Sequence, residues 1–192
     1  MIETLLVFLP LAGAAIAGVI TFMAIDAPKE RKHRLDLAAQ VVTCGFLILA
    51  AILAVVIFYD VGINGNARTT ELFTWIQSGA FEFSWALKVD TLTAVMMIVV
   101  CVVSAMVHVY SIGYMHHDPS VPRFMAYLSL FTFMMLMLIT ADNLVQMFFG
   151  WEGVGLASYL LIGFWYKKPS ANAAAIKAFV VNRVGDFGFG LG

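Results

Sequence analysis

Glu152 is the residue of this sequence with the clearest capacity for chemistry, because it is the one acidic residue in the apolar segment 144–166. The segment is long enough to cross a bilayer as a helix, and Glu152 lies near its middle. An ionised, unpaired carboxylate is very costly in hydrocarbon, so the side chain must be protonated, paired with a cation or hydrated. A proton path needs a carboxylate held between those states, and we interpret Glu152 as such a group.

The segment 171–192 supplies two cations and a second acid. It contains Lys177, Arg183 and Asp186 in a sequence built mostly from Ala, Val, Phe and Gly. Arg183 and Asp186 are three residues apart, so they share one face of a helix and can pair. Lys177 lies nearer the end of the segment, where its long side chain can reach the membrane surface. We favour a proton path here, and a salt bridge that only holds helices together stays open as the alternative.

A further titratable residue, His108, lies in the apolar segment 89–114. Histidine titrates close to neutral pH, so a hydrated His108 is a competent proton relay. A packing residue with satisfied hydrogen bonds is an equally good interpretation.

Six continuous apolar segments predict an all-α fold, a polytopic bundle of about six transmembrane helices. The segments do not alternate, which favours helices over the strands of a barrel. Only Asp142 and Asn143 separate the fourth segment from the fifth, which predicts a tight helical hairpin. The expected spans are 4–25, 37–58, 89–114, 124–141, 144–166 and 171–192.

The longest loop, 59–88, predicts a small β-hairpin on the outer side of the membrane. Its second half alternates apolar and other residues over 81–88, and a strand-forming stretch, 71–76, precedes Ser78 and Gly79. The alternative is an aromatic loop at the membrane interface.

The distribution of Lys and Arg between the loops predicts the orientation. The loops 26–36, 115–123 and 167–170 carry seven of these residues, whereas the opposite side carries Arg68 and Lys88. The positive-inside rule therefore places the amino terminus outside, on the periplasmic side of a bacterial plasma membrane. A mitochondrial inner membrane is the other possible host.

The composition excludes several classes of function. With 62% hydrophobic and 12% charged residues, the chain is not a soluble globular protein. A net charge of −1 gives no reason to expect a nucleic-acid partner. Cys44 and Cys101 lack CxxC spacing, and no haem, iron–sulfur, nucleotide or serine-triad pattern is present. We therefore expect no metal, no cofactor and no soluble substrate in this chain. Because the sequence ends within an apolar segment, we also expect it to be part of a longer protein.

Three motifs resemble a known family. They are VHVYSIGYM at 107–115, GWEGVGLASYLLIGFW at 150–165 and AAIKAFVVNRVGD at 174–186. All three are similar to the largest antiporter-like subunit of proton-pumping NADH:quinone oxidoreductase, respiratory complex I.

The resemblance implies a fold of two inverted five-helix repeats, each with a broken helix. Residues 1–88 would form two amino-terminal helices and the outer hairpin, and residues 89–192 the start of an incomplete repeat. Glu152 matches the family's intramembrane glutamate, whose partner lysine would lie beyond Gly192. Arg183 and Asp186 match a basic–acidic pair thought to switch partners, and Lys177 aligns with a family lysine.

The resemblance also implies that the intact subunit moves protons, driven by quinone reduction in other subunits. FMN, iron–sulfur clusters and quinone would belong to those partners, and a neighbouring antiporter-like subunit and the lipid bilayer would contact this chain. A large subunit of an Mrp-type Na⁺/H⁺ antiporter is the second interpretation, since its motifs are similar. A scaffold whose buried charges only hold helices together is the third.

Overall fold

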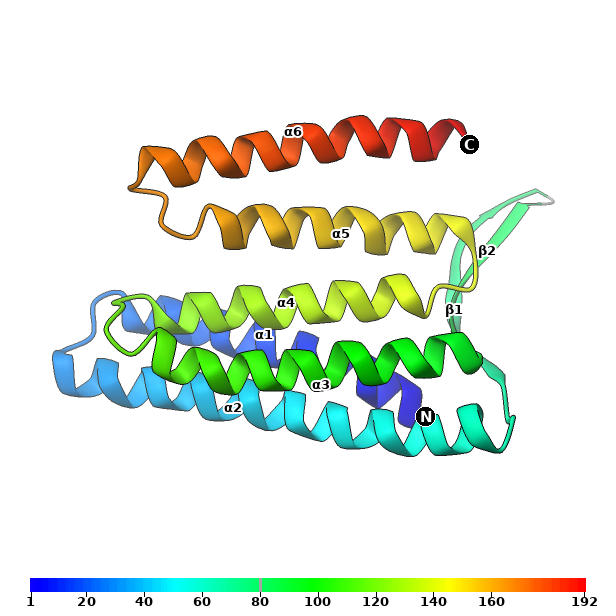
Figure 1. Ribbon diagram of the computed structural model, residues 1–192, viewed down its shortest axis with the longest axis horizontal. Coiled ribbons are helices and arrows are strands. Elements are labelled where there is room, and N and C mark those ends of the chain that lie inside the picture. Colours follow the sequence, from blue (N-terminus) through cyan, green and yellow to red (C-terminus); the bar gives the residue numbers. More distant parts are fainter. Residues whose placement is uncertain (80) are drawn as a thin grey trace.

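The computed structural model describes residues 1–79 and 81–192 and confirms a helical bundle with a β-hairpin at one end (Figure 1). The described part contains six α-helices, one π-helical segment and two strands. In chain order these are α1 (Ile2–Ala24), α2 (Lys29–Ile57), η1 (Phe58–Ile63), β1 (Arg68–Ser78), β2 (Phe81–Val89), α3 (Thr91–Tyr114), α4 (Val121–Ile139), α5 (Leu144–Ile162) and α6 (Pro169–Leu191).

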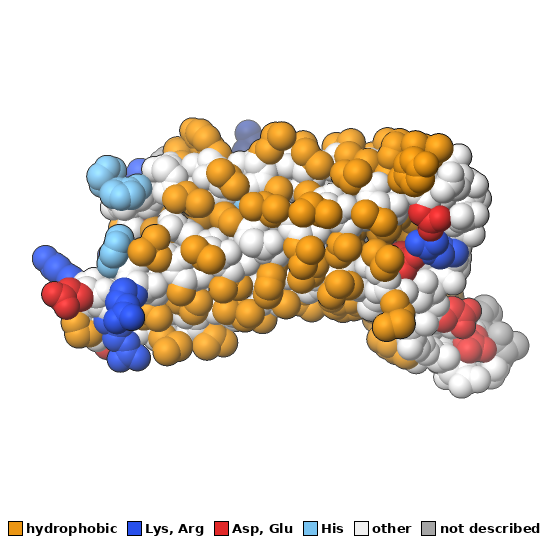
Figure 2. All heavy atoms as spheres, turned by 90° about the horizontal axis from the view of Figure 1, so that it is seen from below, with side chains coloured by type: hydrophobic (Ala, Val, Ile, Leu, Met, Phe, Trp, Pro, Cys, Tyr) orange, Lys and Arg blue, Asp and Glu red, His pale blue; other side chains and the backbone are white. Residues whose placement is uncertain are grey.

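Five of these helices, α1 to α5, are long and apolar enough to cross a membrane. Helix α6 has the same length as α1, 23 residues, but it carries the three ionisable side chains of the segment 171–192. On the face that Figure 2 shows, hydrophobic side chains cover the middle of the bundle, and most charged and histidine side chains lie toward its two ends. This distribution is that of a multi-pass membrane protein.

The loops alternate between the two ends of the bundle. The connections α1–α2, α3–α4 and α5–α6 lie at one end, and the hairpin and the α4–α5 turn lie at the other (Figure 1). The three loop regions that together carry seven Lys and Arg residues, 26–36, 115–123 and 167–170, therefore share one end; they are called the Lys- and Arg-rich loops below.

Helix α5 begins at the predicted residue, and α1, α3, α4 and α6 begin two or three residues from the predicted ones, whereas α2 begins much earlier. Helix α2 begins at Lys29 instead of residue 37, so most of the expected loop 26–36 is helical. Hydropathy marks only the apolar part of a helix and misses the polar turns that extend beyond it. Helix α3 begins at Thr91 because the Asp90 side chain accepts a hydrogen bond from Thr93 N at 2.8 Å, an N-cap.

The main core lies between α1, α2, α3 and α4. Its buried members include Leu6, Ala50, Met97 and Leu136, one from each helix, and Leu87 of β2 packs into the same cluster. Helix α4 also contacts α5, and α5 contacts α6, so α5 and α6 extend the bundle on one side (Figure 1).

The hairpin is tied to the start of α5, which positions Glu152 about two turns further along. Strands β1 and β2 are antiparallel, with Arg68 opposite Val89. The Gln146 side chain accepts from Ala86 N at 3.1 Å and donates to Ala86 O at 2.8 Å. Asn143 caps α5 by accepting from Gln146 N at 2.9 Å, and it donates to Ser84 O at 2.9 Å. The predicted hairpin and the tight α4–α5 turn thus form one hydrogen-bonded unit.

Candidate functional site

Glycines allow α5 to approach its two neighbours closely around Glu152. A Cβ atom on Gly150 would lie 2.6 Å from the backbone of Leu138 in α4, and one on Gly155 would collide with the Asn182 amide of α6. Small residues at such crossings let membrane helices pack through backbone contact. Gly150 therefore sets the spacing of α4 and α5, whereas Gly155 leaves room for the Asn182 side chain between α5 and α6.

Substituting Gly150→Ala is expected to destabilise the protein, because the Leu138 backbone cannot move as a flexible side chain can. We expect a loss of about 1–3 kcal/mol, measured as a lower melting temperature of the full-length protein in mild detergent. Gly45→Ala is the matched control, since a Cβ there meets nothing within 4 Å. Equal melting temperatures for the two variants would contradict the close α4–α5 contact.

The carboxylate of Glu152 forms an ion pair with Arg183 across the α5–α6 interface. Arg183 Nη1 donates to Glu152 Oε1 at 2.7 Å, and Arg183 Nε lies 3.5 Å from Asp186 Oδ2. Asp186 is buried, Glu152 is partly buried with 23% of its side chain exposed, and Arg183 is exposed. One cation thus stands between two carboxylates, and the contact with Glu152 is the shorter.

Aromatic side chains hold the other members of this cluster. Trp151 Nε1 donates to Asp186 Oδ1 at 2.7 Å, which leaves Asp186 Oδ2 buried and without a hydrogen-bond partner among the described residues. The Arg183 guanidinium lies 4.7 Å from the centre of the Phe179 ring, a cation–π contact. Asp186 Oδ2 is therefore an open acceptor within a short movement of Arg183.

A cavity of about 350 Å³ lies between α4, α5 and α6, and it is lined by Trp151 and Asn182, the chain neighbours of Glu152 and Arg183, but by neither member of the ion pair. Its lining includes Trp151 and the polar side chains of Ser158, Tyr159 and Asn182. A space of this size with several polar groups can hold water molecules.

Lys177 and His108 lie outside this cluster. Lys177 is exposed on α6 and pairs with no carboxylate of the described residues. His108 is fully buried between α3 and α4: its Nδ1 lies 2.8 Å from Ser104 O and its Nε2 lies 3.0 Å from Ser129 Oγ. Nδ1–H can donate to that carbonyl, and Nε2 can accept from the Ser129 hydroxyl, which gives a neutral ring with both nitrogens satisfied.

A second charged group, which sequence reasoning missed, lies at the hairpin end. Arg68 bonds to both Glu3 and Asp60, and Asn66 donates to Asp60 at 2.8 Å. The hydrogen bonds to both carboxylates raise the pKa of Arg68 above its ordinary value. The group joins the first turn of α1, the π-helical segment and the first residue of β1. An acid at the front of the first apolar segment was its only signal in the sequence.

Comparisons with known proteins bear on this arrangement of charges. Residues 75–125 match the family model "NADH-Ubiquinone oxidoreductase (complex I), chain 5 N-terminus". Residues 141–192 match the model "NADH:quinone oxidoreductase/Mrp antiporter, TM", so the two matches together cover more than half of the chain. The chain belongs to the antiporter-like subunit family of NADH:quinone oxidoreductase. The predicted resemblance is thereby confirmed.

The similar curated proteins of this family include both bacterial and eukaryotic members. NADH-quinone oxidoreductase subunit L of Rhodobacter capsulatus is 55% identical over 98% of this chain, and that of Rickettsia bellii is 50% identical over all of it. NADH-ubiquinone oxidoreductase chain 5 of Chondrus crispus is 50% identical over 98% of the chain. The chain spans 26–28% of the length of these relatives.

A solved structure shares the fold of this chain. One chain of the membrane-bound sulfane sulfur reductase, an archaeal respiratory membrane complex, aligns with 96% of this chain and 34% of its own length. The TM-score is 0.73 at 18% sequence identity. At that identity, the likeness extends to the fold alone.

Proposed function

We propose that the intact protein translocates protons across a membrane, as a membrane-arm subunit of an NADH:quinone oxidoreductase driven by quinone reduction in other subunits. The observation that carries the proposal is the Glu152–Arg183 ion pair, because it lies near the middle of a membrane-spanning helix with a second acid, Asp186, beside it. A carboxylate, a cation and a second acid at these distances can exchange partners.

In the proposed cycle, Arg183 moves between the two carboxylates. When Arg183 leaves Glu152 for Asp186 Oδ2, now 3.5 Å away, the unpaired Glu152 carboxylate takes up a proton. When Arg183 returns, the proton is expelled. At an effective dielectric constant of ~20, a pair of unit charges 4 Å apart interacts by about 4 kcal/mol, which changes proton affinity by roughly a thousandfold.

Protons would reach Glu152 through water in the cavity beside Trp151 and Ser158. Lys177, six residues before Arg183 on α6, would receive the proton on the side of the Lys- and Arg-rich loops. Both ring nitrogens of His108 have hydrogen-bond partners in the structure. We therefore retain His108 as a proton-path residue only for a state in which at least one of these bonds is broken.

In this proposal the chain divides at residue 88. Residues 1–88 form the two amino-terminal helices with the hairpin, and residues 89–192 begin an antiporter-like repeat. The partner lysine of Glu152 would follow Gly192 in the sequence of the whole protein, and Arg183 would compete with it for the carboxylate.

The partners and the location follow from the same proposal. Other membrane-arm subunits, among them a neighbouring antiporter-like subunit, would contact the chain, and FMN, iron–sulfur clusters and quinone would reside in partner subunits. We favour a bacterial plasma membrane, with the amino terminus and the hairpin on the periplasmic side. Support for the bacterial membrane comes from the Rhodobacter capsulatus relative at 55% identity, against 50% for the Chondrus crispus relative. Support for the orientation comes from the shared end of the Lys- and Arg-rich loops.

A second candidate function is transport by an Mrp-type Na⁺/H⁺ antiporter, because the model that matches residues 141–192 covers that family too. The experiment that separates the two uses the full-length protein within its purified complex, reconstituted in liposomes. We expect proton uptake that requires NADH and quinone and does not depend on sodium. Sodium-dependent proton exchange without NADH oxidation would establish the antiporter instead.

A further inference from the structure

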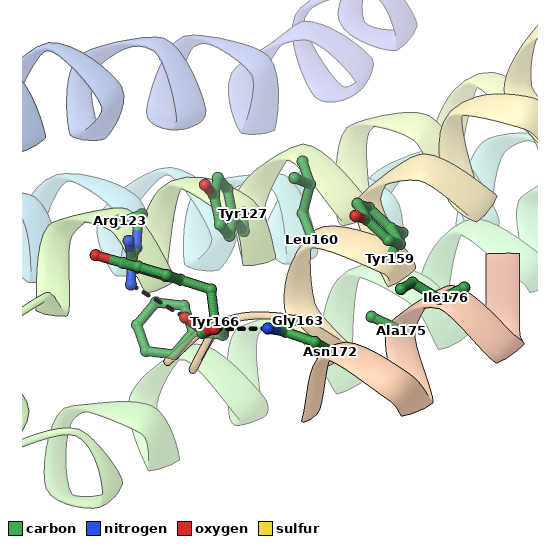
Figure 3. A pocket seen from close by; sticks show the side chains of 10 residues that line it. Arg123, Tyr127, Tyr159, Leu160, Gly163, Tyr166, Asn172, Ala175 and Ile176 are labelled. Carbon is green, nitrogen blue, oxygen red and sulfur yellow. Dashed lines mark hydrogen bonds between the residues drawn. The ribbon is translucent and has the colours of Figure 1, made fainter. Parts of the chain in front are cut away.

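Away from the ion pair, a cavity of about 440 Å³ opens between α4, α5 and α6 at the end of the bundle that carries the α5–α6 loop (Figure 3). Side chains from all three helices and from the loop line it. Those that matter here are Arg123, Tyr127, Tyr159, Tyr166, Asn172 and Ile176.

The unusual feature of this cavity is the cation in its wall. Arg123 is half-buried, and no carboxylate among the described residues pairs with it. Its Nη2 donates to Phe164 O at 3.1 Å, whereas its Nε is buried with no hydrogen-bond partner in the described chain. A guanidinium has five N–H donors, and an unpaired buried charge is costly. Arg123 therefore lacks an anion.

The surroundings of Arg123 favour negative charge. Helices α4 and α6 both begin here, and neither Ser120 nor Lys168 at their N-caps makes a side-chain capping bond. The positive ends of two helix dipoles thus face this region, together with exposed Lys167. The nearby acid, Asp118, lines an adjoining cavity of about 230 Å³ that shares Arg123, Phe164 and Tyr166 with this one. Its carboxylate oxygens accept from Ser120 N and Trp165 Nε1 at 2.8 and 2.9 Å, and it forms no ion pair with Arg123.

The same cavity has an apolar and aromatic side. The Arg123 guanidinium lies 4.6 Å from the centre of the Phe164 ring and 5.2 Å from that of Tyr166. Ile176 on α6 also lines the cavity and is 57% exposed, so the cavity wall continues onto an apolar part of the helix surface. A ligand that fits has an anionic head for Arg123 and an apolar tail for the helix surface.

We propose that this cavity binds an anionic phospholipid, with the headgroup phosphate on Arg123 and an acyl chain along Ile176. The planar guanidinium matches the geometry of phosphate oxygens, and the ends of membrane-spanning helices lie at the depth of the headgroups. Basic pockets between transmembrane helices are known to bind such headgroups on the positively charged side of a membrane. The site stands apart from Glu152 and does not depend on proton translocation.

The test measures lipid retained by the full-length protein, purified in mild detergent with phosphatidylglycerol or phosphatidylcholine and examined by native mass spectrometry. We expect wild-type protein to retain phosphatidylglycerol in preference to phosphatidylcholine. Arg123→Gln should reduce that retention about tenfold, which corresponds to ~1.4 kcal/mol. Arg123→Lys keeps the charge but loses the planar fork of the guanidinium. Its phosphatidylglycerol retention should lie between those of the wild type and Arg123→Gln, and it checks that the site still folds.

Arg34→Gln is the matched control, because it removes an exposed positive charge from the same end of the bundle. This variant should retain phosphatidylglycerol as the wild type does. Equal phosphatidylglycerol retention by wild type and Arg123→Gln overturns the proposal. Equal retention of the two lipids by the wild type also overturns it. That result is expected if another part of the assembly supplies the anion for Arg123. Displacement of the lipid by millimolar inorganic phosphate would assign the site to free phosphate instead.

Discussion

Glu152→Gln is expected to reduce proton translocation by about tenfold or more in the assembled complex, because the amide keeps the shape of the side chain but cannot take up or release a proton. The Arg183 Nη1 that now lies 2.7 Å from Glu152 Oε1 would keep an oxygen acceptor, so the helices should still pack. The measurement is the ratio of protons moved to electrons passed in liposomes, with assembly verified by native electrophoresis.

Glu71→Gln serves as the control for this experiment. It removes an exposed acid from the hairpin, far along the chain from the α5–α6 interface, and should leave the ratio unchanged. A wild-type ratio in the Glu152→Gln complex would remove Glu152 from the mechanism.

Arg183→Gln should have the second-largest effect, because it removes the one cation that pairs with Glu152 among the described residues. Without that cation, the carboxylate neutralises itself by holding its proton, so translocation should stop while the complex still assembles. Arg183→Lys keeps the charge but loses the fork that spans Glu152 and Asp186, and partial activity is expected.

Assembly of the complex and proton translocation, measured together, separate the proposal from a purely structural role of the charges. If Arg183 only joins α5 to α6, Arg183→Gln should prevent assembly, and the complexes that do assemble should translocate protons normally. Loss of translocation in fully assembled complexes, with partial recovery in Arg183→Lys, is the outcome that a moving cation requires.

The fold was predictable from the sequence to the extent that it depends on local patterns. Continuous apolar segments gave the helices, and the alternation over 81–88 gave the second strand. The start of α2 was missed because its first turns, from Lys29, are helical without being apolar. The π-helical segment 58–63 carried no recognisable signal.

The site was predictable in its members but not in its pairing. Burial energetics singled out Glu152, and helical spacing joined Arg183 to Asp186. That Arg183 bonds more closely to Glu152 than to Asp186 depends on the register between α5 and α6. This register rests on contacts between residues far apart along the chain, such as Gly155 and the Asn182 side chain. Nothing in the sequence pattern indicated the role of Trp151, whose indole N–H donates to Asp186.

The most direct test of a proton held and released by Glu152 is a difference infrared spectrum of the purified complex before and during NADH-driven turnover. We predict a carboxylic acid C=O band that changes with turnover in the wild type and is absent in Glu152→Gln. Identical difference spectra for the two proteins would mean that the protonation of Glu152 does not change, and would contradict the proposed mechanism.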